Sequence, residues 1–198
     1  VAFVRALLGD AVANKALAYC EYVVNPTPLP PAHQADCAVE GDPFRVCLIL
    51  YDQFEMLDTF GPLAAFSAAR RAAGLDVRVT VVAEFATVQA FKGPRAVTDA
   101  TFETLAFKDF DVALLPGGVG SLRETYNPAM IGFLRELAGK ATRVLSVCSG
   151  APVVAATGAL DGKRATTNKI LFDLLVAGWD RVKWVPQARW VTDENITT

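Results

Sequence analysis

Short apolar segments rich in β-forming residues alternate with helical segments along most of this chain. Four of them are predicted to be buried strands. These are RVCLILYD (45–52), DVRVTVVAE (76–84), DFDVALLPGG (109–118) and TRVLSV (142–147). Because apolar strands that alternate with helices build a sheet covered on its faces, the sequence predicts an α/β sandwich around a mostly parallel sheet.

The helical segments between these strands carry recognisable end signals. They are LDTFGPLAAFSAARRAAG (57–74), NPAMIGFLRELAGKA (127–141), SGAPVVAATGAL (149–160) and ILFDLLVAGW (170–179). We expect Gly74 to close the first helix, Asn127 to cap the second with Pro128 at its first position, and Gly158 to lie near the end of the third. Residues 96–104 are predicted as a strand or loop edge, and residues 188–198 as strand-like.

The N-terminal part of the chain differs in texture. Residues 1–24 have apolar positions at a helical period and predict a helix. Residues 25–43 hold five prolines without a periodic pattern, which predicts a proline-rich linker. With 198 residues in all, we expect one domain, whose main α/β body is residues 44–198.

Composition limits the classes of partner. The net charge is −2 and no block of basic residues is present, so nucleic acid is a poor candidate. No apolar run approaches the ~20 residues that cross a membrane. Four cysteines without close pairing favour a reducing compartment, hence the cytoplasm, although a disulfide between Cys20 and Cys37 stays open. The single histidine, His33, lies in the proline-rich segment, and no zinc site or other cofactor is indicated.

Cys148 stands where a predicted strand meets a predicted helix. A buried small apolar residue is the simpler interpretation. However, Ser149, Gly150 and Ala151 are small enough for a sharp strand-to-helix turn, which would direct the sulfur to the rim of the sheet. The unpaired N–H groups at a helix start favour a thiolate, so we expect a lowered pKa and a reactive thiol.

Two further motifs end at the same rim. PGGVGS (116–121) is either a loop that needs glycine for its backbone or a loop whose amides face a developing anion beside the sulfur. Asp58, just before the predicted start of its helix, either caps that helix or exchanges a proton with a substrate beside Cys148. The residues leave both alternatives open.

Some chemistry is disfavoured by what the chain lacks. A cysteine–histidine pair needs a histidine near the nucleophile, and His33 lies in the linker, so peptidase or glutaminase activity is not favoured. RATTNK (164–169) is predicted as a strand followed by a polar turn, most simply a solvated strand end.

Three segments together, LDTFGP, LLPGG and VCSGAPVVAATGALDGKRATTNK, resemble the ThiJ/PfpI family of the class I glutamine-amidotransferase-like superfamily. The similarity covers about residues 44–198 and is greatest to isonitrile hydratases and to ligand-sensing domains of AraC-type regulators. It implies a flavodoxin-like three-layer sandwich, a homodimer, Cys148 as nucleophile and Asp58 as its acidic partner. It also implies an anion or substrate pocket at Gly117, Gly118, Val119, Ser149 and Gly150.

The chain departs from this family in three places. Ser149 replaces a frequent threonine and keeps the hydroxyl, whereas Asn168 stands where histidine is frequent and cannot act as a general base. Residues 1–24 resemble the family's C-terminal helix, yet they come first. We therefore infer a circular permutation or an altered segment order, and expect residues 1–24 to pack on the same sheet as residues 44–198.

The function expected from these features is a cysteine-dependent hydratase or lyase acting on a small molecule, with isonitrile to N-formamide as the reaction that the resemblance implies. The alternatives are a non-catalytic ligand-binding or regulatory domain, and a glyoxalase-type or stress-related activity, against which Asn168 argues.

Overall fold

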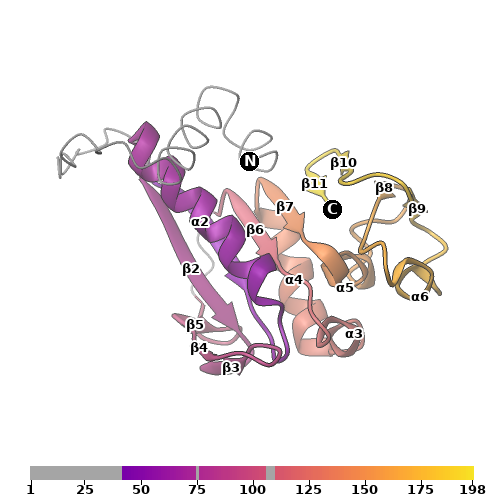
Figure 1. Cartoon of the computed structure of the whole chain (residues 1–198), viewed down its shortest axis with the longest axis horizontal. Coiled ribbons are helices and arrows are strands. Elements are labelled where there is room, and N and C mark those ends of the chain that lie inside the picture. Colours follow the sequence, from indigo (N-terminus) through magenta and orange to yellow (C-terminus); the bar gives the residue numbers. More distant parts are fainter. Residues whose placement is uncertain (1–41, 75, 106–109) are drawn as a thin grey trace, which may run out of the picture. The chain divides into compact units, whose positions relative to one another are not determined.

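A sheet of seven strands organises the described part of the chain, which is residues 42–74, 76–105 and 110–198 of a computed structural model (Figure 1). The strands are β1 (Phe44–Ile49), β2 (Val77–Ala83), β5 (Ala100–Thr101), β6 (Val112–Leu115), β7 (Arg143–Ser146), β10 (Thr192–Asp193) and β11 (Ile196–Thr197). Their order is β10-β11-β7-β6-β1-β2-β5. Strand β6 pairs in parallel with β1 and β7, β7 with β11, and β2 with β5, whereas β10 and β11 form an antiparallel hairpin.

The strand order confirms the predicted α/β fold with a mostly parallel central sheet flanked by helices. Five of these strands, β1, β2, β6, β7 and β11, can be numbered 1 to 5 as they occur along the chain. Across the sheet they then lie in the order 2-1-3-4-5, which is the flavodoxin-like strand order. The chain moves from β1 to one neighbour, β2, and later returns to the other neighbour, β6. In such sheets ligands bind beyond the carboxyl ends of the strands at this reversal point.

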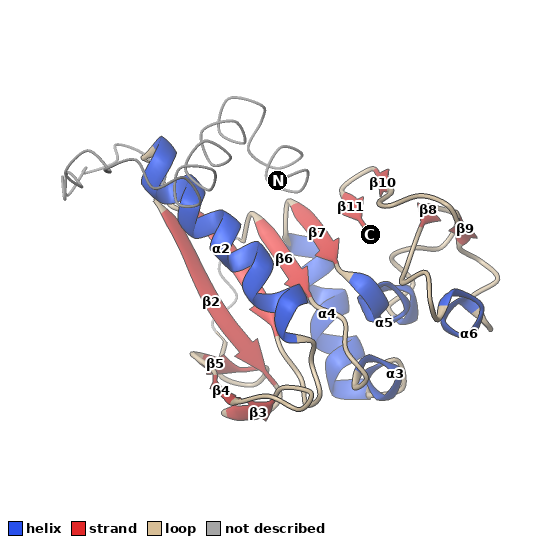
Figure 2. Cartoon of the chain, in the orientation of Figure 1, coloured by secondary structure: helices blue, strands red, loops and turns tan. Residues whose placement is uncertain are grey.

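Five α-helices are assigned among the described residues (Figure 2). They are α2 (Met56–Ala73), α3 (Ser121–Glu124), α4 (Pro128–Lys140), α5 (Ala151–Ala156) and α6 (Phe172–Val176). The predicted end signals are confirmed. Gly74 and Gly158 have positive φ values of 67° and 85°, and the Asn127 side chain accepts hydrogen bonds from the amides of Ala129 and Met130.

Helix α6 is shorter than the predicted helix over 170–179. It ends at Val176 because Ala177 leaves the helical region, with ψ at 126°, and Gly178 adopts a left-handed φ of 83°. The apolar run of that segment was therefore a poor guide to helix length.

Two small sheets complete the secondary structure. An antiparallel pair joins β3 (Thr87–Gln89) to β4 (Arg95–Val97), and a parallel pair joins β8 (Arg164–Ala165) to β9 (Lys183–Trp184). The segment 96–104 thus contributes β4 and β5, and the end of the chain forms the β10–β11 hairpin, as the strand-like patterns predicted.

The chain divides into two compact units. One comprises residues 1–44 and 60–78, and the other comprises residues 45–59 and 79–198. The second unit has a core built on β6 and most of β1, where Val46 through Ile49 and Val112 through Leu115 are fully buried. Each buried aliphatic side chain contributes roughly 1.5–3 kcal/mol to stability. The start of α2, including Asp58, belongs to this second unit.

Several predictions fall on residues outside the described ranges. The helix over 1–24, most of the linker over 25–43, the packing of residues 1–24 on the sheet, and any pairing of Cys20 with Cys37 all lie there. The single-domain organisation and the permuted segment order therefore stay predictions. Within the described ranges, no helix has both the length and the apolar character needed to cross a membrane.

Candidate active site

Cys148 sits on a strained turn at the carboxyl end of β7. Its φ of +56° lies in the left-handed region, which costs a non-glycine residue about 1–3 kcal/mol. A single 3-10 turn, Cys148–Gly150, leads directly into α5. A Cβ atom on Gly150 would lie 2.9 Å from the carbonyl oxygen of Pro116, so glycine allows the turn to pack closely on the neighbouring loop. The predicted strand–turn–helix geometry is present.

The loop after β6 brings Gly117 between the two predicted catalytic residues. The Gly117 amide donates a hydrogen bond to the Asp58 carboxylate, with N and Oδ2 3.1 Å apart. A Cβ atom on Gly117 would lie 2.8 Å from that same oxygen and 2.8 Å from Cβ of Cys148. Tyr51, which is buried, donates its hydroxyl to the carbonyl oxygen of Pro116 at 2.7 Å and fixes the start of the loop.

Asp58 lies inside the first turn of α2 rather than before the helix, because α2 begins at Met56. Its carboxylate accepts a hydrogen bond from the Gly117 amide and lies beside Cys148. Burial is the largest influence on its pKa, which is raised, and the hydrogen bonds from Gly117 and Cys148 oppose that rise. Of the two alternatives left open by the sequence, the position beside Cys148 is the one found in the structure.

The expected lowering of the Cys148 pKa is wrong. The pKa of the thiol is raised, first because burial disfavours the thiolate and second because the negative charge of Asp58 repels it. Hydrogen bonds from Asn168 and from the Ser149 amide act in the opposite direction without overcoming these effects. The Ser149 amide at the helix start therefore favours the thiolate, as predicted, but burial of the sulfur and the nearby carboxylate together outweigh it.

Asp58 and Cys148 influence each other in opposite directions. The negative charge of Asp58 raises the pKa of the Cys148 thiol, whereas the thiol stabilises the Asp58 carboxylate and lowers its pKa. With one proton on the pair, the proton can reside on the sulfur or on the carboxylate. This arrangement allows Asp58 to accept the thiol proton when the sulfur forms a bond to a substrate.

Asn168 is part of this site, which the sequence did not predict. Its side-chain nitrogen lies 3.1 Å from the sulfur of Cys148. The amide orientation is fixed because its oxygen accepts the backbone N–H groups of Ile170 and Leu171 at 2.9 and 3.1 Å. The NH₂ group must therefore face the sulfur, where it stabilises negative charge.

The segment around Asn168 is not a solvated strand end, contrary to the simpler interpretation of RATTNK. Thr166 and Thr167 are buried. The Thr167 hydroxyl and the backbone N–H of Asn168 both donate to the carbonyl oxygen of Cys148, at 2.8 and 3.1 Å. Local polarity was a poor guide here, because these polar groups bond other parts of the protein. Thr167 and Asn168 bond the strand-to-helix turn Cys148–Gly150, here called the elbow, and Thr166 bonds Val185 and Thr198. The signal available in the sequence was the pair of threonines followed by Asn168.

The residues predicted for the anion pocket are gathered here, but several of their amides are occupied. Gly117 donates to Asp58, and Gly118 donates to the Ser149 hydroxyl at 3.0 Å. That hydroxyl returns a bond to the Gly118 carbonyl oxygen at 3.1 Å and accepts one from Ser121. The Gly150 amide is bonded within the turn, and the Val119 side chain is 58% exposed. The role of these five residues as an anion pocket stays a prediction.

A cavity of about 520 Å³ opens beside the sulfur. It is lined by Cys148, the segment Thr166–Lys169, the segment Pro186–Arg189, and Thr198. No group of three or more histidine, cysteine or acidic side chains that could hold a metal ion occurs among the described residues. The nucleophile that lines this cavity is the Cys148 thiol, and Asn168, which bonds it, also lines the cavity.

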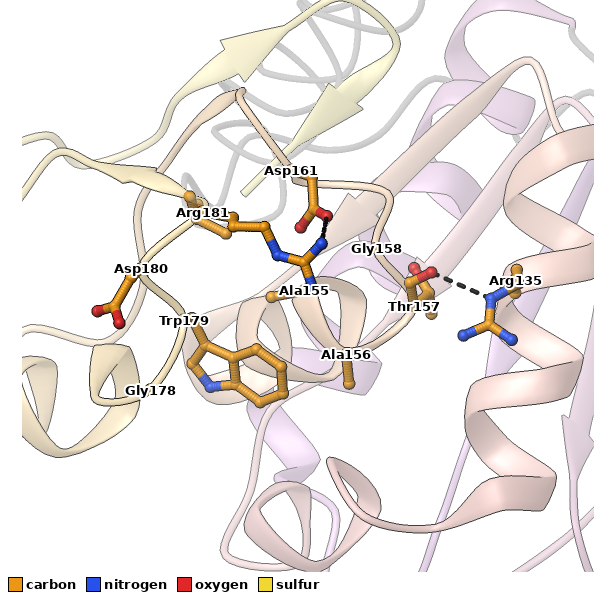
Figure 3. Close-up of a pocket in the computed structure, with 11 residues that line it drawn as sticks. Arg135, Ala155, Ala156, Thr157, Gly158, Asp161, Gly178, Trp179, Asp180 and Arg181 are labelled. Carbon is orange, nitrogen blue, oxygen red and sulfur yellow. Dashed lines mark hydrogen bonds and ion pairs between the residues drawn. The ribbon is translucent and has the colours of Figure 1, made fainter.

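A second cavity, of about 390 Å³, lies at the end of α5, and no cysteine is among its lining residues (Figure 3). Its two arginines already have structural partners. Arg135 donates to the carbonyl oxygen of Thr157 at 3.1 Å, and Arg181 forms an ion pair with Asp161 at 3.0 Å. Since these contacts hold the helix end and the following turn, we place the candidate site at Cys148.

The fold and the site together define a class of α/β proteins that carry a cysteine on a strained turn at the edge of a flavodoxin-like sheet. The model of the DJ-1/PfpI family matches residues 44–198, and the chain belongs to that family.

Curated relatives within this family differ in activity. The chain is 33% identical over 132 residues to an isonitrile hydratase of Pseudomonas putida, covering 66% of this chain and 55% of that protein. It is 35% identical over 127 residues to an uncharacterised protein of Streptomyces lividans, covering 64% and 88%. A deglycase of Pyrococcus horikoshii is 30% identical over 113 residues, covering 57% and 66%. The chain thus spans about half the length of the isonitrile hydratase.

Solved structures agree with the fold. A ThiJ/PfpI family protein from Pseudomonas syringae superposes with a TM-score of 0.68 at 26% identity, covering 88% of this chain and 69% of that one. DJ-1beta of Drosophila melanogaster gives a TM-score of 0.64 at 24% identity, covering 79% and 81%. The resemblance predicted from the motifs is confirmed at the level of the family.

The close fit at Gly117 leads to a testable prediction. Gly117→Ala places a methyl group where Asp58 and Cys148 approach each other, so we expect a stability loss of about 1–3 kcal/mol and a further loss of Cys148-dependent activity. Urea unfolding and turnover would be measured on the same preparation. The control is Gly132→Ala in α4, where an added Cβ meets nothing within 4 Å; there we expect a stability gain of up to ~1 kcal/mol. Equal behaviour of the two variants would contradict the tight packing at Gly117.

Proposed function

We propose that this protein is a cysteine-dependent hydratase that converts a small isonitrile into the corresponding N-formamide. The observation that carries the proposal is the position of Asp58 beside Cys148. A Cβ atom on Gly117 would lie 2.8 Å from both the Asp58 carboxylate oxygen and Cβ of Cys148, so a proton acceptor lies beside a nucleophile. Asn168 bonds the same sulfur without being able to act as a base, which favours a reaction in which the carboxylate handles the protons. The similarity to an isonitrile hydratase supports this choice of substrate.

The reaction begins with addition of the thiol to the isonitrile carbon. Asp58 takes the proton from the Cys148 sulfur and delivers it to the terminal carbon as the sulfur–carbon bond forms. The product is a thioimidate, R–N=CH–S–Cys148, in which the atoms of the thiol and the isonitrile are all retained. Asn168 stabilises the negative charge on sulfur until the new bond is complete.

Water then completes the conversion. Asp58 removes a proton from a water molecule whose oxygen attacks the thioimidate carbon, and the nitrogen gains a proton. Collapse of R–NH–CH(OH)–S–Cys148 breaks the carbon–sulfur bond, and the hydroxyl proton returns through Asp58 to the sulfur. The released product is R–NH–CHO, so the net change is the addition of one water molecule.

The direct test is incubation of the protein with a simple alkyl isonitrile. We expect formamide to appear by proton NMR above the rate in buffer, and intact-mass measurement to show a transient adduct on the protein equal to the mass of the isonitrile. An absence of formamide above the buffer rate would overturn the proposal.

A second candidate function is favoured by one observation. The raised pKa of the Cys148 thiol reduces the thiolate fraction at neutral pH, as expected of a ligand-binding or regulatory domain that retains the elbow without turnover. Slow alkylation of Cys148 together with saturable binding of a small molecule and no product would support this alternative. Among the described residues, no contact at Cys148 favours a glyoxalase-type activity.

The proposal includes a cytoplasmic homodimer that acts on a small molecule without a cofactor. The side chains of Ile170 and Leu174 are 91% and 60% exposed, which is compatible with a contact between subunits.

A further inference from the structure

The cavity beside Cys148 is lined by positively charged side chains. Two of its lining residues, Lys169 and Arg189, are cationic, and none of its lining side chains is acidic. The acidic partner of the thiol, Asp58, is not among the lining residues. A molecule that reaches the sulfur through this cavity therefore meets positive charge.

The ammonium group of Lys169 is held at the cavity by hydrogen bonds. It donates to the Thr166 hydroxyl oxygen and, at 2.9 Å, to the carbonyl oxygen of Thr167. The Thr166 hydroxyl can serve as acceptor because its own proton goes to the carbonyl oxygen of Val185 at 2.7 Å. The ring of Phe172 also lies 5.3 Å from the lysine nitrogen. These contacts fix the position of the charge, and they leave one of the three N–H donors of Lys169 for another partner.

Neither cation is neutralised within the described part of the chain. In the β10–β11 hairpin, Glu194 pairs with Lys163, and Asp193 accepts a hydrogen bond from the backbone amide of Arg164. No described carboxylate forms an ion pair with Lys169 or Arg189. Unpaired cations that line a cavity with a nucleophile are typical of a site for an anionic ligand.

The segment Thr166–Lys169 connects this charge to the reaction centre. Asn168 contacts the sulfur, and the next residue, Lys169, presents its ammonium group to the same cavity. A substrate bound by its anionic end at Lys169 would have its other end near Cys148. A cavity of about 520 Å³ suits a small molecule of this kind.

We infer that the preferred substrates of this site are anionic, namely small isonitriles that carry a carboxylate, with Lys169 and Arg189 binding the carboxylate and Cys148 facing the isonitrile carbon. This inference rests on the proposed function for the reacting group. The anion preference itself rests on the charges and contacts of the cavity and can be tested without turnover.

The kinetic test compares isocyanoacetate with its neutral methyl ester. We expect kcat/KM of the wild type to favour the anion by roughly tenfold, as for one charge-assisted hydrogen bond, and this preference to weaken in high salt. Lys169→Met should remove most of the preference by raising KM for isocyanoacetate, whereas Lys169→Arg should retain it. Lys183→Met removes an equal charge from an exposed residue outside the cavity and should leave the preference unchanged.

A binding test separates the two proposals. With the Cys148→Ala variant, which cannot react, we expect N-formylglycine to bind roughly tenfold more tightly than neutral N-formylglycinamide by calorimetry, and Lys169→Met in that background to abolish the difference. Equal binding of the two compounds, or an undiminished difference in the double variant, overturns the anion site. Anion-selective binding with no hydration of any isonitrile supports the anion site and overturns the proposed hydratase activity. Hydration without preference between the two isonitriles supports the hydratase activity and overturns the anion site.

Discussion

Replacing Cys148 with alanine is expected to reduce formamide production to the rate in buffer, a loss of at least about 10³-fold. The reason is that the thioimidate cannot form without the sulfur, and Asp58 then has no thiol proton to transfer. The folded state should survive the change, because alanine removes one atom from a half-buried position. The measurement is formamide production by NMR, with circular dichroism to verify the fold.

The matched control for this prediction is Cys47→Ala. Cys47 lies fully buried in β1, and burial raises the pKa of its thiol to about 12, so it has no chemical role at neutral pH. We expect this variant to lose stability, by about 1 kcal/mol for the atom removed, and to keep the turnover of the folded protein. Turnover in Cys148→Ala within tenfold of the wild type would place the chemistry elsewhere.

The sequence was sufficient to predict the elbow because the information is local. Cys148 follows a strand of apolar residues and precedes three small residues that permit a sharp turn, and the structure has that turn at the predicted place. The cap at Asn127 was predictable for the same reason. The asparagine side chain accepts hydrogen bonds from the first free amides of its own helix, and the proline that follows suits the first helical position. Turns and helix caps that depend only on residues adjacent in the sequence could therefore be predicted.

The electrostatics of the site were not predictable in this way. The raised pKa of Cys148 depends on how deeply the sulfur is buried and on the charge of Asp58, which comes from a different element of the fold. The contact of Asn168 likewise requires the segment after β8 to fold back onto the elbow, where two groups donate to the Cys148 carbonyl oxygen. No periodicity or spacing encodes these contacts, so the polar residues of RATTNK predict a solvated strand end although the structure buries Thr166 and Thr167.

The proton transfer assigned to Asp58 gives the second large effect. Asp58→Asn is expected to lower kcat/KM for an isonitrile by about 10²–10⁴-fold, because the amide cannot accept the thiol proton. The same change should make Cys148 easier to alkylate. The charge of Asp58 raises the pKa of the thiol, so its removal lowers that pKa and increases the thiolate fraction at a given pH. Activity and thiol reactivity should thus move in opposite directions.

The pH dependence provides the measurement. In the wild type, the raised pKa of Asp58 predicts that turnover falls on the acid side at a higher pH than for an ordinary aspartate, since the carboxylate must be ionised to take the proton. In Asp58→Asn that acid limb should vanish, and the rise of iodoacetamide alkylation with pH should begin at lower pH than in the wild type. Glu55→Gln is the control. It removes a charge that influences Asp58 but not the sulfur, so alkylation of Cys148 should keep its wild-type profile. If Asp58→Asn slowed alkylation as much as turnover, the carboxylate would be holding the loop in place rather than moving a proton.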